Sequence, residues 1–254
     1  MENISPDIIL FLVVTGFIAA FIDSVVGGGG LISLPALLLT GLPPTLALGT
    51  NKLASLMCSS TSTLSFLRSG KIDLNIIKYL FPLSFIGSAL GVITVQQIPS
   101  QFLKPMVVVM LIIVTIYTFT RKEWGDTSTY QGMTKKTAYL SGIAAFSIGF
   151  YDGFFGPGTG SFLIFGLIHI FGFNFIKASG NAKILNFVSN ISALVIFALR
   201  GQIYYLIGLP VALSMVMGAQ VGTQLALKNG AKLIKPIFVT MSLAVAAKLL
   251  IQMH

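Results

Sequence analysis

The sequence predicts an all-α polytopic membrane protein, and three observations support this fold class. Hydrophobic residues make up 55% of the 254 residues and charged residues only 9%, whereas soluble domains carry about 25% charged residues. Apolar stretches close to the roughly 20 residues that span a bilayer recur along the chain. The two sides of a central polar segment also match each other. Most side chains must therefore face lipid or other apolar helices.

Hydropathy and helix breakers together indicate about eight to ten hydrophobic segments. Ten are visible, at 7–26, 31–42, 46–67, 76–96, 103–120, 137–155, 160–173, 178–199, 203–227 and 234–252. The second and seventh are short, and each follows a glycine-rich break, Gly27 to Gly30 and Gly156 to Gly160. Because such backbone is tolerated at membrane depth only beside protein or a water-filled cavity, we expect re-entrant or half helices there.

The longest polar segment, Arg121 to Lys136, divides the chain into a first transmembrane repeat, 1–120, and a second, 137–254. Matching residues are separated by a constant offset of 131: Gly49 with Gly180, Lys52 with Lys183, Gly70 with Gly201, Gly87 with Gly218, Gly91 with Gly222, and Lys104-Pro105 with Lys235-Pro236. Asp23 and Gly27 match Asp152 and Gly156 at an offset of 129. A register kept over this many sites indicates an internal duplication.

The distribution of lysine and arginine favours inverted repeats. If each half crosses the membrane an odd number of times, 12 basic residues lie on one side and 4 on the other. Parallel halves give a weaker split of about 9 to 7, and the positive-inside rule favours the stronger asymmetry. We therefore expect both termini outside, although Lys52 and Lys183 escape the rule if they lie within the membrane.

Several functional classes are disfavoured. The net charge of +9 comes from residues between apolar stretches, which fits an inner membrane leaflet rather than nucleic acid. Cys58 is the only cysteine, and His169 and His254 are the only histidines, so we expect no disulfide, metal site or other cofactor. Met1 to Asp7 lacks a basic signal-peptide region. Motifs for nucleotide binding and metalloprotease or thiol chemistry are absent, so we expect a non-enzyme driven by a gradient or a partner ATPase.

The glycine breaks predict an anion site. Glycine allows backbone N–H groups to converge on an anion, and the N-terminus of a half helix adds partial positive charge. The alternative is that the glycines only allow close helix packing. We favour the site for the clustered breaks, and packing for the pairs Gly87/Gly91 and Gly218/Gly222.

Charged and polar side chains near the breaks add candidates with open interpretations. Asp23 and Asp152 each end a long apolar run, where a carboxylate either caps or pairs structurally or takes part in proton coupling. Lys52 and Lys183 either provide countercharge to an anion or snorkel to the interface. The substrate-binding candidates are Gly27, Gly28, Gly29, Gly30, Ser33, Asn51, Lys52, Gly156, Pro157, Gly158, Ser161, Asn181, Lys183 and Asn186, and the proton-coupling candidates are Asp23 and Asp152.

These residues carry a family resemblance. Asp23 with Gly27 to Gly30, Thr50-Asn51-Lys52, and the run from Gly149 through Phe-Tyr-Asp-Gly-Phe-Phe-Gly-Pro-Gly-Thr-Gly to Ser161 resemble the sulfite exporter TauE/SafE family, also called toluene-sulfonate uptake permeases. The resemblance covers essentially the whole chain. It implies about eight membrane helices, so that some of the ten segments are half-spans, and transport of sulfite, sulfonates or related small acids.

We therefore expect a secondary transporter of small anions in the cell (inner) membrane, with a site between the two broken segments. The substrate is a small sulfur-containing anion, coupled to a proton or substrate gradient. One alternative is a passive anion channel, and another is a membrane subunit or scaffold for an enzyme of sulfur metabolism. The sequence does not indicate oligomeric state or transport direction.

Overall fold

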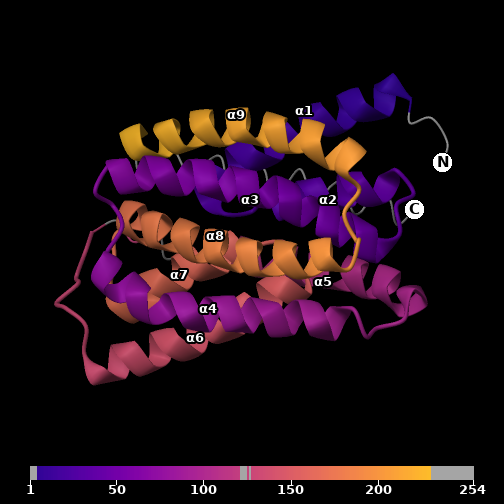
Figure 1. The fold of residues 1–254 in the computed structure, drawn as a ribbon. Helices are drawn as coiled ribbons and strands as arrows, with labels where there is room; N and C mark the ends of the chain where they lie inside the picture. The colour runs from indigo at the N-terminus through magenta and orange to yellow at the C-terminus, as the bar shows by residue number, and fades with distance from the viewer. Residues whose placement is uncertain (1–4, 121–124, 126, 230–254) are drawn as a thin grey trace.

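The computed structural model describes residues 5–120, 125 and 127–229. That part of the chain forms nine α-helices joined by short connections and one longer one (Figure 1). Their bounds are α1 Pro6–Val26, α2 Gly30–Leu39, α3 Pro44–Arg68, α4 Leu74–Val95, α5 Ser100–Thr120, α6 Lys135–Phe154, α7 Thr159–Phe171, α8 Phe175–Leu199 and α9 Tyr205–Asn229. The all-α fold class is therefore confirmed.

The nine helices correspond to the first nine apolar segments, and the segment predicted at 234–252 lies outside the described residues. The polar connection ends two residues earlier than expected, because Thr134 and Thr137 form a capping box that starts α6 at Lys135. Helices α1, α4, α8 and α9 are long and apolar enough to cross a membrane by length and composition. Helices α2 and α7, which follow the glycine breaks, are short and apolar, as expected for half helices.

Helices α3 and α8 pack against each other at the centre of the molecule and run in opposite directions. A Cβ atom on Gly49, near the start of α3, would touch Phe197 near the end of α8. A Cβ atom on Gly180, near the start of α8, would touch Phe66 near the end of α3. In Figure 1, α1 likewise enters the bundle from the right, whereas α6 enters it from the left. Matching helices of the two halves thus run antiparallel.

Contacts between the halves occur in reciprocal pairs. The backbone N–H of Asp73 donates to Asn181 Oδ1 at 2.9 Å, and the N–H of Tyr204 donates to Thr50 Oγ1 at 2.9 Å. Each residue of one bond is 131 positions from its counterpart in the other. The N-terminal part of α8 therefore bonds the connection before α4, and the N-terminal part of α3 bonds the connection before α9.

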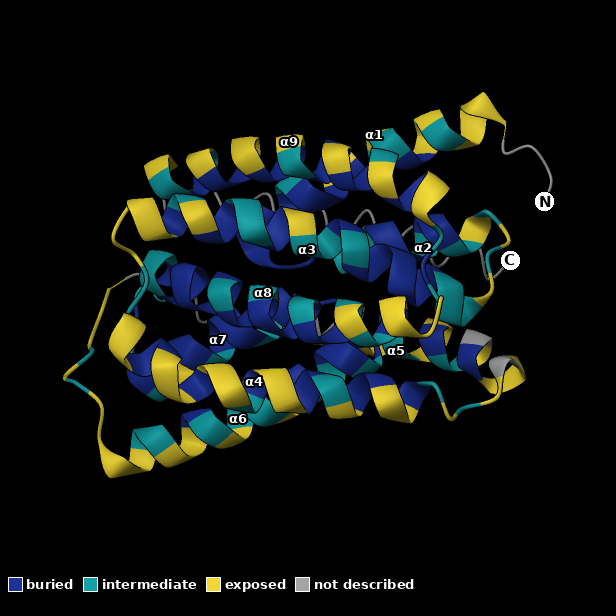
Figure 2. Ribbon diagram, in the orientation of Figure 1, coloured by how far each residue is buried: buried dark blue, intermediate teal, exposed yellow. Residues whose placement is uncertain are grey.

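The glycine pairs lie where outer helices cross. Gly87 on α4 sits against the carbonyl of Phe146 on α6, and Gly218 on α9 sits against the carbonyl of Phe17 on α1. This confirms the packing role, because small residues let membrane helices approach closely without a hydrophobic driving force. Figure 2 shows α7 and α8 mostly buried, with exposed residues on the outward faces of α4, α6 and α9.

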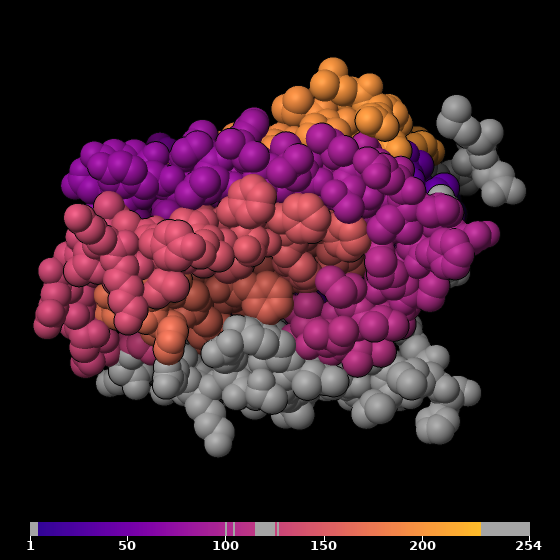
Figure 3. Space-filling model, turned by 90° about the horizontal axis from the view of Figure 1, so that it is seen from below, coloured from indigo at the N-terminus to yellow at the C-terminus, as the bar shows by residue number. Residues whose placement is uncertain are grey.

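The longer connection, 121–134, is anchored at one end of the bundle by its described part. The N–H of Thr129 donates to Gly172 O at 2.8 Å, and the ring of Tyr130 packs on Phe173. Lys177 lies over both rings and within 3.1 Å of Asp73. Figure 3 shows the face beneath the bundle, where α6 and α7 lie beside α4 and α5. Lys177 of the second half thus pairs with Asp73 of the first half at this end of the molecule.

Glycine at the α4–α6 crossing is predicted to be required for stability. A Cβ atom at Gly87 would collide with backbone of α6, including the N–H of Phe150 at 2.9 Å. We expect Gly87→Ala to destabilise the protein by about 1–3 kcal/mol or more, the usual cost of overpacking. The matched control is Gly142→Ala at the same crossing, where a Cβ atom meets only the flexible end of Leu83 at 3.2 Å. Thermal unfolding in detergent should separate the two variants, and equal melting temperatures would contradict the packing role.

Candidate functional site

The two glycine breaks lie against each other at the centre of the molecule. Helix α1 ends at Gly27 with φ +81°, and α6 is followed by Gly156 with φ +98°, conformations that favour glycine. The N–H of Ser161, in the first turn of α7, donates to Gly27 O at 3.1 Å. Its hydroxyl donates to Val26 O at 2.8 Å. These bonds join the end of α1 to the start of α7, so the breaks of the two halves form one unit.

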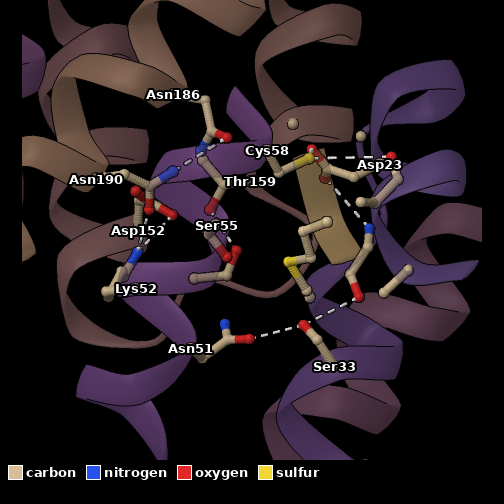
Figure 4. A pocket seen from close by; sticks show the side chains of 18 of the residues that line it. Asp23, Ser33, Asn51, Lys52, Ser55, Cys58, Asp152, Thr159, Asn186 and Asn190 are labelled. Carbon is tan, nitrogen blue, oxygen red and sulfur yellow. Dashed lines mark hydrogen bonds and ion pairs between the residues drawn. The ribbon is translucent and has the colours of Figure 1, made fainter. Parts of the chain in front are cut away.

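A pocket beside this unit leaves about 420 Å³ of space between its lining atoms. Seven helices and both breaks contribute to it: the lining residues are Ala19, Ala20, Asp23, Gly27, Gly29, Gly30, Ser33, Asn51, Lys52, Ser55, Cys58, Asp152, Gly156, Gly158, Thr159, Gly160, Asn186, Asn190 and Met215. In Figure 4, Lys52 and Asp152 lie on one side of the pocket, and Asp23 and Cys58 on the other. The N-terminal ends of α2 and α7 both reach the pocket.

Lys52 of the first half forms a buried ion pair with Asp152 of the second. Lys52 Nζ lies 2.9 Å from Asp152 Oδ1, and the two side chains are 4% and 2% exposed. Asp152 Oδ2 accepts a 2.5 Å hydrogen bond from Ser189, and Lys52 Nζ donates to Asn190 Oδ1 at 3.2 Å. Both carboxylate oxygens therefore have a direct donor, and both donors are charged or strongly polar groups.

Lys183 of the second half forms the matching pair with Asp23 of the first. Its Nζ lies 2.6 Å from Asp23 Oδ2 and also donates to the backbone carbonyl of Asp23. Gly29 N–H donates to Asp23 Oδ1 at 3.2 Å, so the carboxylate also caps the start of α2. The side chain of Asp23 is 17% exposed, compared with 2% for Asp152. The two pairs thus join the same kinds of side chain, but their carboxylates differ in exposure.

These geometries settle what the lysines and aspartates contact. Neither lysine snorkels to an interface, because both are almost completely buried and paired. Each carboxylate forms the structural pair that was one of the two interpretations of the sequence. Leaving either partner of a buried pair alone is strongly unfavourable. The charge of each lysine is therefore already balanced by a carboxylate of the other half.

Donors that remain available surround the pocket. Within the described chain, no group accepts a hydrogen bond from the side-chain amides of Asn51 and Asn186, although the oxygens of both are bonded, to Ser33 and Asn190. The N–H groups of Gly30 and Gly160, at the starts of α2 and α7, likewise donate to no described oxygen outside their helices. Such donors, with the partial charge of two helix N-termini, suit an oxyanion.

Most of the predicted site residues line this pocket, and five do not. Gly28 and Pro157 belong to the breaks but do not line the pocket. Ser161 donates its hydroxyl and its N–H to the backbone carbonyls of Val26 and Gly27. Asn181 lies at the end of the bundle, where it bonds Asp73 and Lys177. Lys183 lies behind Asp23. For Ser161 and Asn181 the structure gives a backbone-fixing role, and 11 of the 16 predicted residues line the pocket.

Four lining residues with a hydroxyl, thiol or amide side chain were not among the predicted site residues: Ser55, Cys58, Thr159 and Asn190. Helical spacing could have indicated two of them from the sequence. Ser55 follows Lys52 by three residues, and Asn190 follows Lys183 by seven, so each shares a helix face with its lysine. Cys58 also lies 131 residues before Ser189. Both contact the carboxylate of their own ion pair, Cys58 at 3.6 Å from Asp23 Oδ2.

Comparison with known proteins agrees with this arrangement. The family model described as sulfite exporter TauE/SafE matches residues 12–249. The chain belongs to the TauE/SafE family. It is 40% identical to the "Probable membrane transporter protein ORF9" of Sinorhizobium sp., over 98% of this chain and 95% of that protein. It is 36% identical to the "Probable membrane transporter protein YfcA" of Escherichia coli K12, over 99% and 93%. No solved structure matches the chain.

The TauE/SafE assignment makes this chain a multi-pass membrane transporter, because its relatives are named as membrane transporters and its helices are long and apolar enough to span. The family run around Asp152 contains both the carboxylate of one ion pair and the second glycine break. The residues that carry the family resemblance are therefore also residues that build the pocket.

The buried pair of this TauE/SafE protein predicts a non-additive double-mutant cycle. We expect Lys52→Met to cost about 3–5 kcal/mol, because it leaves the Asp152 carboxylate buried without its cation. Adding Asp152→Asn should recover part of that loss, since the amide carries no charge and still accepts from Ser189. Thermal unfolding of the two single variants and the double variant in detergent measures the coupling. Losses that simply add would mean that the two charges do not stabilise each other.

Proposed function

We propose that the chain is a secondary transporter that moves a small sulfur-containing anion together with a proton. The observation that carries the proposal is a pocket that joins two helix N-termini and two buried Lys–Asp pairs. Helix N-termini and amide groups stabilise an oxyanion, while the carboxylates provide places for a proton. The family assignment supports transport, and its description supports sulfite and related anions.

Charge balance is the reason for coupling. Two lysines and two aspartates sum to zero, so an anion alone would add an uncompensated charge in a medium of low dielectric constant. Protonating one carboxylate leaves its lysine unbalanced, and a monovalent anion then restores neutrality. Anion and proton therefore stabilise each other's binding, which is the thermodynamic basis of coupled transport.

We further propose that residues 1–120 and 137–254 form inverted repeats around this pocket in the cell (inner) membrane. The antiparallel α3 and α8, the reciprocal hydrogen bonds and the crossed ion pairs all support this arrangement. Lys71 and Lys177 gather at the end where α3 leads to α4 and α7 leads to α8. By the positive-inside rule, this end faces the cytoplasm.

The function predicts saturable uptake that depends on a pH gradient. We expect proteoliposomes containing the full chain to accumulate labelled sulfite or sulfoacetate faster when the outside is more acidic, because the proton gradient then drives the anion inwards. Uptake should be measured at several anion concentrations, with and without the gradient, and with empty liposomes as the control.

The other outcomes of this measurement identify the alternatives. Ohmic current without saturation would indicate a passive anion channel. Failure of the purified chain to bind or move any small anion would favour a membrane subunit or scaffold for a partner enzyme. Saturable uptake that does not depend on the pH gradient would support a transporter but contradict the proton coupling.

A pair of asparagine variants tests the site itself. Asn186 lines the pocket with a free amide, whereas Asn181 on the same helix is used in backbone contacts outside it. We expect Asn186→Ala to raise KM for the transported anion about tenfold, the effect of losing one hydrogen bond of about 1.5 kcal/mol to a charged group. Asn181→Ala should lower stability without changing KM. A KM for Asn186→Ala equal to that of the wild type would place the anion elsewhere.

A further inference from the structure

A chain of buried side-chain contacts leads away from Asp23 through three helices. Cys58 Sγ lies 3.6 Å from Asp23 Oδ2, and Ser24 Oγ lies 4.0 Å from Cys58 Sγ. Ser24 Oγ and Ser62 Oγ are 2.9 Å apart, and Thr223 Oγ1 donates to Ser62 Oγ at 3.0 Å. All four side chains are buried. The series starts at the pocket and ends on α9, six residues before Asn229, the last residue of that helix.

The bonding of these hydroxyls differs from that of their neighbours. Serine and threonine in membrane helices commonly donate to a carbonyl three or four residues back, as Ser59, Thr61 and Ser65 do on α3. Ser62, on the same helix, instead joins side chains of α1 and α9. Bonds between side chains are a minority of protein hydrogen bonds. Close helix packing alone does not require a hydroxyl at each of these positions.

Symmetry provides an internal control for the series. At the matching offsets, Cys58 corresponds to Ser189, which donates to Asp152. Beyond that first contact the correspondence ends, because Ser24, Ser62 and Thr223 correspond to Gly153, Ala193 and Val92. Asp152 therefore has no matching series of hydroxyls, and its side chain is only 2% exposed. The two carboxylates have equivalent ion pairs but different connections.

We propose that Asp23 is the carboxylate that carries the coupling proton, and that Thr223, Ser62, Ser24 and Cys58 form the buried part of its relay toward the cytoplasmic end. This inference rests on the proposed function. A proton arriving at Thr223 Oγ1 displaces the hydroxyl proton of Thr223 to Ser62, that of Ser62 to Ser24, and that of Ser24 to Cys58. The thiol proton of Cys58 then passes to Asp23 Oδ2. Each relay group loses one proton and gains one, and release reverses the steps.

The surroundings of Asp23 suit this role. Lys183 from α8, Cys58 from α3 and the N–H of Gly29 contact its carboxylate, and Lys52 and Asp152 line the same pocket. Cys58 Sγ has a second acceptor in Ala20 O, at 3.9 Å, which is farther than Asp23. Protonation of Asp23 releases Lys183 from its ion pair and makes the pocket positive. Asp152 and Lys52 meanwhile stay paired.

Two transport modes separate a proton relay from structural damage. Net uptake driven by a pH gradient moves protons, whereas exchange of labelled for unlabelled anion at equal pH needs no net proton transfer. The probes are labelled sulfite and sulfoacetate, with a pH-sensitive dye inside proteoliposomes of the full chain. We expect Thr223→Val and Ser62→Ala to slow net uptake and proton entry at least tenfold and to leave exchange within about twofold of wild type. The shape of threonine is kept in Thr223→Val, and Ser62→Thr, which retains the hydroxyl, should preserve proton entry.

The matched control is Ser65→Ala, which removes a hydroxyl from α3 that donates only to the helix backbone. It should leave both transport modes unchanged. Equal ratios of net uptake to exchange in Thr223→Val, Ser62→Ala and Ser65→Ala would overturn the relay while leaving the proposed function intact. Wild-type protein that shows no uptake driven by a pH gradient would overturn the proton coupling and, with it, this inference.

Discussion

The arrangement of this protein depends on burying two lysines and two aspartates within a membrane domain. A charge at that depth is costly unless a partner neutralises it. Each half supplies one lysine and one aspartate, yet each ion pair joins residues of different halves. Neither half satisfies its own charges in this way, so the pairs require α3 to reach α6 and α8 to reach α1. The glycine breaks follow from the same constraint, since they let α1 and α6 end beside the central helices.

The match between the halves extends to the backbone but not to every side chain. Hydrogen bonds at Asp73 and Tyr204 repeat at the same offset, although the acceptors are an asparagine in one and a threonine in the other. Near the ion pairs, a cysteine replaces a serine, and hydroxyls on one side correspond to small or apolar residues on the other. Two similar charge pairs thus lie in unequal surroundings. The side chain of Asp23 is 17% exposed, whereas that of Asp152 is 2% exposed.

Sequence reasoning predicted the membrane class, nine of the helices and the convergence of Asp23, Lys52 and Asp152, because hydropathy, glycine clusters and intramembrane charges are local signals. It left open which groups the lysines contact, since that depends on how α3 lies against α6 and α8 against α1. Ser161 and Asn181 were predicted as substrate ligands, but they lie outside the pocket and bond the backbone. The side chain of Ser161 bonds Val26, and that of Asn181 bonds Asp73, both in the other half. No local sequence pattern reveals such contacts.

A neutral pocket also constrains what the transporter can carry. With both pairs intact, the described ionisable groups of the pocket and Lys183 sum to zero, so the proposed transport binds an anion together with a compensating proton. One carboxylate balances a monovalent sulfonate. A doubly charged anion would require a second proton, which would have to reach Asp152, whose side chain is 2% exposed compared with 17% for Asp23. Under the proposed coupling, this unequal access favours singly charged anions, so sulfite in its singly charged form should be taken up in preference to doubly charged sulfoacetate.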